Sequence, residues 1–89
     1  MLVALIARDK TGALEVRKAN RADHLAYIDA TGAVAQAGPL IEGGEMAGSL
    51  VILDVADMAA AEAWAAGDPY AKAGLFSSVE LIEWKKVIG

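Results

Sequence analysis

The 89-residue sequence contains no cysteine, and this absence excludes disulfides, thiolate catalysis and cysteine–zinc sites. It also contains a single histidine, whereas transition-metal sites usually draw several nitrogen or sulfur ligands, so we expect no bound metal. Because a chain without cysteine suits a reducing compartment, we expect a cytoplasmic protein.

Long apolar runs are missing as well. No segment approaches the roughly 20 apolar residues that a membrane-spanning helix needs. The apolar stretch at the N-terminus is about six residues long, which is too short for the core of a secretory signal peptide. The sequence therefore predicts neither a membrane span nor a targeting segment.

Basic residues are scarce, since 8 Lys and Arg face 12 Asp and Glu for a net charge of −4. They form no run and no patch interleaved with aromatic residues, so we expect no binding to nucleic acid or to an anionic membrane. Gly43-Gly44 lacks the spacing and the lysine of a phosphate-binding loop, and no G-x-S-x-G motif of serine hydrolases is present.

Hydrophobic residues, in contrast, make up 56% of the sequence, which is high for a short soluble chain. A chain of this length has room for one domain and one core, so we predict a single domain over residues 1–89. Strands are predicted where short apolar runs are bounded by turn residues, at residues 2–7, 33–41, 48–56 and 78–87.

Two helices are predicted between these strands. Asn20 is a favoured N-cap residue and Asp23 follows in the first turn, so the first helix is expected to begin at Asn20 and to end at Thr31-Gly32. The second is expected over residues 57–66, with Asp57 as its cap. The resulting order, β–α–β–β–α–β, predicts a ferredoxin-like α+β fold, an antiparallel sheet with both helices on one face.

The predicted strands are apolar on both faces. In the third strand Val51 and Leu53 point one way, while Leu50 and Ile52 point the other. Only one face of the sheet is covered by helices, so the other would be an apolar patch larger than monomers usually expose. A few exposed leucines would explain the pattern, but we expect a homodimer joined through the sheet faces, with Leu50 or Ile52 in its interface.

His24, the sole histidine, lies beside the apolar stripe of the first helix. A half-buried imidazole is the usual general acid or base at neutral pH, although a histidine at such a boundary is also commonly held by a backbone carbonyl. Arg17 and Arg21 would share its face and form a cationic site for a small anion or enolate if the helix were continuous. The predicted cap at Asn20 argues against continuity, and the arginines are otherwise expected to be solvated and to pair with Glu15 or Asp23.

Asp68 follows the second helix and precedes Pro69 and Tyr70. Aspartate is a favoured N-cap and proline is favoured next, so a short helical turn that ends at Gly74 accounts for this stretch without any function. Ser49, which opens the third strand, offers a hydroxyl to a ligand. From the residues alone, Asp68 is either a helix cap without further function or one member of a chemical site.

A series of short motifs runs along nearly the whole chain: Asp9-Lys10, Arg17, Arg21, His24-Leu25, Gly38-Pro39, Gly48-Ser49, Asp68-Pro69-Tyr70, Ala73-Gly74 and Trp84-Lys85-Lys86. In their order and spacing they resemble the YCII-related domain family. Two departures are a shorter loop between Gly38-Pro39 and Gly48-Ser49, and Ala22 at a position where the family often has proline.

The resemblance implies a ferredoxin-like dimeric α+β barrel and a site built on a histidine–aspartate pair, which maps to His24 and Asp68. It also implies that Asp68 both caps the helical turn and holds an imidazole nitrogen with its second oxygen. One branch of the family resembles lyases that remove chloride from chlorinated, hydroxylated aromatic rings, a reaction that needs proton transfer but no metal and no covalent nucleophile.

The sequence thus leaves three interpretations open. The first is a small cofactor-free enzyme in which His24 and Asp68 perform general acid–base chemistry on a small phenolic or anionic metabolite. Its predicted pocket has His24, Asp68 and Tyr70 as walls, with Ser49 and one of Arg17 or Arg21 at the rim. The second is a non-catalytic dimeric module that binds such a molecule, and the third is a structural interaction domain.

Overall fold

The computed structural model describes residues 1–89. The elements follow one another as β1 (Leu2–Asp9), α1 (Leu14–Thr31), β2 (Val34–Glu42), β3 (Glu45–Asp54), α2 (Met58–Gly67), α3 (Pro69–Lys72) and β4 (Phe76–Trp84). No helix is long and apolar enough to cross a bilayer.

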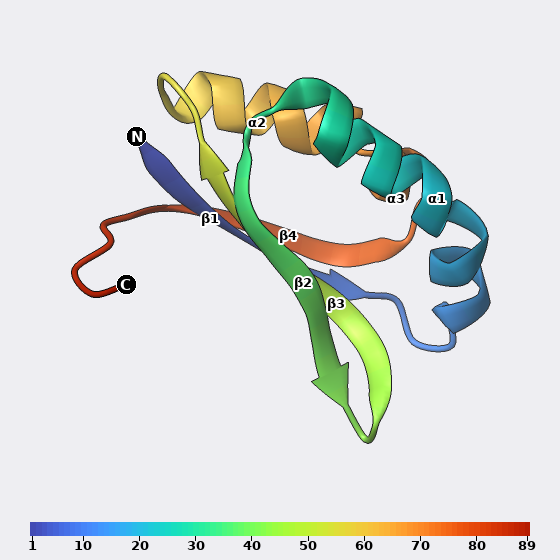
Figure 1. Ribbon diagram of the computed structural model, residues 1–89. Helices are drawn as coiled ribbons and strands as arrows, with labels where there is room; N and C mark the ends of the chain where they lie inside the picture. The colour runs from blue at the N-terminus through green and yellow to red at the C-terminus, as the bar shows by residue number, and fades with distance from the viewer.

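The four strands form one antiparallel sheet in the order β2-β3-β1-β4, and all helices lie on one of its faces (Figure 1). The two β–α–β halves therefore interleave, because β1 and β3 are the central strands while β2 and β4 form the edges. The predicted ferredoxin-like arrangement is confirmed. Pro39, which cannot donate to a strand ladder, lies on the edge strand β2, as expected for proline in a sheet.

The core lies between the sheet and the helices. Alternate residues of β1 and β3 turn to this face, in agreement with the period of two along a strand. Together with two residues of α2 they form the central cluster, which comprises Val3, Leu5, Ala7, Val51, Leu53, Ala61 and Trp64.

Two hydrogen bonds fix α1 beside α2. The Tyr27 hydroxyl donates to the carbonyl of Trp64 at 2.8 Å, and the Trp64 indole Nε1 donates to Thr31 Oγ1 at 2.9 Å. Burial raises the pKa of Tyr27, with a smaller contribution from the charge of Asp68, so its hydroxyl stays protonated and can donate. These two hydrogen bonds set the spacing of α1 and α2, and the site described below depends on that spacing.

The predicted start of the first helix at Asn20 is wrong. Helix α1 runs without a break from Leu14 to Thr31, and Asn20 lies in its interior, where Nδ2 donates to the carbonyl of Val16 at 2.9 Å. Asparagine loses only a few tenths of a kcal/mol relative to good helix formers, so tertiary contacts of Arg17 on the preceding turn easily override its preference for a cap. The end at Gly32 is confirmed, since this residue has a φ of 61°.

The other predicted boundaries hold within a few residues. The turn between β2 and β3 falls at Gly43 and Gly44, with φ of 57° and 79°, and Asp57 caps α2 by accepting from the amide of Ala60. Strand β3 begins at Glu45 rather than 48, and β4 spans Phe76–Trp84 rather than 78–87. Gly48 fits where β3 crosses β1 closely, because a Cβ there would collide with the carbonyl oxygen of Ala7.

The face of the sheet opposite the helices is apolar and uncovered. The register places Leu50 beside Ile6, and Ala4 between Ile52 and Ile82. Leu50 and Ile82 are 41% and 47% exposed, whereas Ile52 at the centre is only 9% exposed. Leu50 and Ile52 thus lie on the open face and Val51 on the core face.

We predict that this face packs on the same face of a second copy. Leu50→Glu places a charge in the apolar patch and is expected to convert a dimer into a monomer, because burying an unpaired carboxylate costs more than the patch gains. The measurement is sedimentation velocity at micromolar concentration. Val16→Glu is the control, since Val16 is 38% exposed but lies on helix α1. A wild-type protein that sediments as a stable monomer contradicts the prediction.

Candidate functional site

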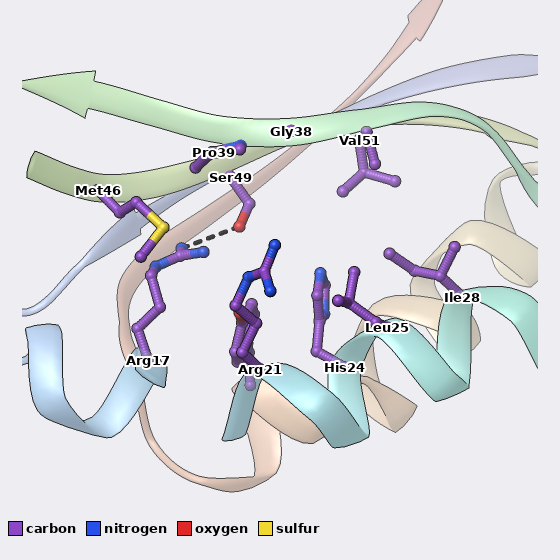
Figure 2. A pocket seen from close by; sticks show the side chains of 12 residues that line it. Arg17, Arg21, His24, Leu25, Ile28, Gly38, Pro39, Met46, Ser49 and Val51 are labelled. Atoms are coloured by element: carbon purple, nitrogen blue, oxygen red, sulfur yellow. Dashed lines mark hydrogen bonds between the residues drawn. The ribbon is translucent and has the colours of Figure 1, made fainter. Parts of the chain in front are cut away.

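A cavity of about 160 Å³ opens between helix α1 and strands β2 and β3 (Figure 2). Polar side chains on α1 and an apolar wall on the strands enclose it. Its lining residues are Arg17, Arg21, His24, Leu25, Ile28, Ala37, Gly38, Pro39, Met46, Ser49, Val51 and Tyr70. The space is similar to a cavity of about 150 Å³ that holds a benzene ring in another protein, so a single six-membered ring fits it.

His24 is held in one orientation. Its Nδ1 lies 2.8 Å from Oδ1 of Asp68, across 44 positions of sequence, and both side chains are almost completely buried. A carboxylate can only accept, so Nδ1 donates and the neutral ring carries its free lone pair on Nε2. No protein group hydrogen-bonds Nε2, while the ring itself lines the cavity. The arrangement leaves one imidazole nitrogen free for a ligand.

Asp68 connects α2, α3 and α1. Its Oδ1 accepts both from His24 and from the backbone amide of Tyr70, at 3.0 Å, so it is at once an imidazole partner and the N-cap of α3. The expectation that the second carboxylate oxygen would hold the ring is wrong, because one oxygen accepts both bonds. The expectation that Asp68 forms a wall is also wrong, because it lies behind His24 and does not line the cavity.

Tyr70 lies between His24 and Arg17. Its ring stacks on the imidazole of His24 with centroids 3.9 Å apart, and the Arg17 guanidinium lies 4.6 Å from the ring centroid. Since the imidazole covers one face of the ring, the guanidinium takes the other. Burial raises the pKa of Tyr70, and the nearby positive charges of Arg17 and Arg21 lower it less, so at neutral pH its hydroxyl is a proton-bearing donor.

Arg17 is a buried member of the wall rather than a residue of the rim. Its Nε and Nη2 donate to the two carboxylate oxygens of Asp9 at 2.7 and 2.8 Å, and Nη2 also donates to Ser49 Oγ at 2.9 Å. Burial lowers the pKa of the guanidinium, but the hydrogen bonds and charge of Asp9 raise it more, so Arg17 remains charged. The alternative of a solvated arginine paired with Glu15 is wrong, since Glu15 lies 3.8 Å from Lys18 instead.

Arg21 lines the same cavity from an exposed position. Because α1 is continuous, Arg17, Arg21 and His24 lie one above the other on one face of the helix, and Figure 2 shows all three pointing toward the strands. Both arginines line the cavity, where the sequence predicted only one.

The sequence did not identify the partner of Arg17 or the apolar wall. Asp9 ends β1 and belongs to one of the motifs of the family resemblance, but nothing in its local sequence indicates that it pairs with Arg17. Pro39, Met46 and Val51 reach the cavity only because the register of β2 and β3 places them opposite α1. No cluster of three or more metal-binding side chains occurs in the structure.

Comparison with known proteins gives consistent matches. The model of the YCII-related domain family matches residues 1–85. Protein YciI of Escherichia coli O6:H1 is 35% identical, with 98% of this chain and 99% of that protein covered, and an uncharacterized protein of Haemophilus influenzae is 36% identical over the same shares. The 5-chloro-2-hydroxyhydroquinone dehydrochlorinase of Burkholderia phenoliruptrix AC1100, solved with 2,5-dihydroxybenzoquinone, superimposes with a TM-score of 0.90 at 32% identity, covering 96% of this chain and 94% of that one.

We predict that the ion pair between Asp9 and Arg17 is a large contributor to stability. Asp9→Asn leaves a buried guanidinium without its counter-charge and is expected to cost about 3–5 kcal/mol. The exposed pair of Arg8 and Glu42 is the matched control, since Glu42→Gln should cost less than about 1 kcal/mol. Urea denaturation measures both, and equal losses for the two variants would contradict the assignment of a buried pair.

The contact of His24 with Asp68 predicts the imidazole tautomer. Nitrogen-15 NMR of the neutral ring should find the proton on Nδ1, and Asp68→Ala should shift it toward Nε2 because the acceptor is gone. The control is Asp57→Ala, which removes a helix cap of the same kind without touching His24. Each variant loses a helix cap worth about 1 kcal/mol, so a change of tautomer that occurs in Asp68→Ala alone is due to the lost carboxylate and not to the lost cap. An unchanged tautomer in Asp68→Ala would disprove the interaction.

Proposed function

Since this chain belongs to the YCII-related domain family, we propose that it is a small enzyme that uses His24 and Asp68 for general acid–base chemistry on a small hydroxylated or anionic ring compound, without a cofactor. The observation that carries the proposal is the free Nε2 of His24 in a ring-sized cavity, with Nδ1 held by a buried carboxylate. A structural interaction domain that binds no ligand does not require a histidine held in one orientation beside a cavity.

The pair provides what proton transfer requires. The Nε2 lone pair takes a proton from a bound hydroxyl, and the adjacent Asp68 carboxylate stabilises the imidazolium that results. The same nitrogen can then return the proton to another atom of the ligand. Stacking on Tyr70 and the bond to Asp68 hold the ring in place throughout, so no reorientation is needed between the two transfers.

Such a proton shuttle is sufficient for the reaction that names the solved relative. In a chlorinated hydroquinone, one hydroxyl proton moves to the ring carbon that bears chlorine, and chloride leaves with the electron pair of its bond. Release of the second hydroxyl proton then gives a quinone. The ring is oxidised at its oxygens and reduced at that carbon, so no external oxidant is consumed. The relative's bound 2,5-dihydroxybenzoquinone and the cavity of about 160 Å³ support a single-ring ligand for this chain.

The proposal predicts that His24→Gln lowers turnover by a factor of about 10²–10⁴, the usual contribution of a general acid or base. The assay is chloride release from 5-chloro-2-hydroxyhydroquinone. Binding of 2,5-dihydroxybenzoquinone, followed by its absorbance, should change little, because glutamine preserves most of the cavity wall.

Two outcomes would contradict this assignment. If the wild type binds 2,5-dihydroxybenzoquinone but releases no chloride, the protein is a binding module rather than an enzyme of this type. If His24→Gln retains full turnover, another group transfers the proton.

A further inference from the structure

Not every basic side chain at the cavity has an acidic partner. Three basic side chains of α1, Arg17, Arg21 and His24, line it, and two buried carboxylates lie behind them. Asp9 pairs with Arg17, and Asp68 holds His24. One of the three basic groups is therefore left without an acidic partner, and that group is Arg21.

The Arg17 side chain is held by contacts with other residues of the protein. Its guanidinium makes a two-pronged contact with Asp9, donates to Ser49 and lies over the ring of Tyr70. Its positive charge is neutralised by a carboxylate less than 3 Å away, with both side chains at most 6% exposed. Arg17 therefore positions Ser49 and Tyr70, and it has little charge left to attract a ligand.

Arg21 differs in every one of these respects. Its side chain takes part in none of the ion pairs or side-chain hydrogen bonds of the structure. It lies between the other two basic residues on the same face of α1, and Figure 2 shows its side chain between theirs, pointing toward the strands. An arginine offers a planar set of donors that matches a carboxylate or a pair of ring oxygens.

We propose that Arg21 alone recognises the charge of the ligand, which is a monoanion with its negative oxygen next to α1, such as a phenolate, an enolate or a carboxylate on a single ring. This assignment rests on the proposed function for the location of the ligand. The two arginines then have different roles. Arg17 is a positioning residue, and Arg21 is the residue that determines specificity for an anion. With the oxygen on Arg21, the ligand lies against Nε2 of His24, whose place on α1 is three residues further along.

The test compares two ring probes of the same shape, benzoate and benzamide, and one anion without a ring, formate. Binding to the folded protein is followed by NMR shifts of His24 and Tyr70. Arg21→Gln should weaken benzoate by about tenfold or more, the usual worth of a charge-assisted hydrogen bond, and leave benzamide unchanged. Arg21→Lys should lie between, because lysine keeps the charge without the planar fork.

The control is Lys18→Gln, which removes a charge from the same helix at a residue that lies outside the cavity. The proposal holds if Arg21→Gln weakens benzoate while Lys18→Gln does not, and if added salt weakens benzoate in the wild type more than in Arg21→Gln. It is overturned if the two variants weaken benzoate equally, if Arg21→Gln has no effect, or if the wild type binds no anion.

The outcomes for this proposal and for the proposed function are separable. Formate that binds through Arg21 while neither ring probe binds refutes the ring-sized ligand and leaves the role of Arg21 intact. Benzamide that binds as tightly as benzoate supports a ring site and refutes the charge recognition by Arg21.

Discussion

The arrangement of the helix layer depends on the hydrogen bonds that the Asp68 carboxylate accepts. A single oxygen caps α3 through the amide of Tyr70 and holds the imidazole of His24 on α1. A buried carboxylate without partners would be very costly, so both bonds are also what allows Asp68 to be 2% exposed. Capping of α3 and orientation of the imidazole therefore depend on the same atom, and neither can be changed without the other.

Tyr70 extends this contact to the second buried charge. Its ring fills the space between His24 and Arg17, which lie seven residues, or about 10.5 Å, apart along α1. Arg17 in turn reaches Asp9 at the end of β1 and Ser49 on β3. The polar side of the cavity is thus a continuous set of contacts from α3 to the central strands, and its members have little freedom to reorient around a ligand.

This rigidity fits the proposed acid–base role, because proton transfer gains most when the donor and acceptor are already oriented. The relatives match this chain over nearly their whole length at 32–36% identity, and the solved one shares its fold. Within that frame Arg21, which lines the cavity, has no ion-pair partner in the protein, and this is why we propose it as the residue that selects the ligand.

By itself, the sequence determined the order of the elements, because apolar runs, caps and glycine turns are local signals. The end of α1 at Gly32 and the hairpin turn at Gly43-Gly44 could be predicted from local sequence alone. Each of these residues has a positive φ, a conformation that favours glycine. The pairing of His24 with Asp68 came from a family resemblance, because two residues 44 positions apart carry no local signal of contact.

Only the tertiary structure decided which charges are compensated. The continuity of α1 through Asn20, the partner of Arg17 and the separate status of Arg21 all depend on contacts between distant segments. A buried ion pair such as Asp9 with Arg17 is stable only where packing excludes water from both groups at once. That exclusion is a property of the assembled layers, and the local sequence around either residue does not contain it.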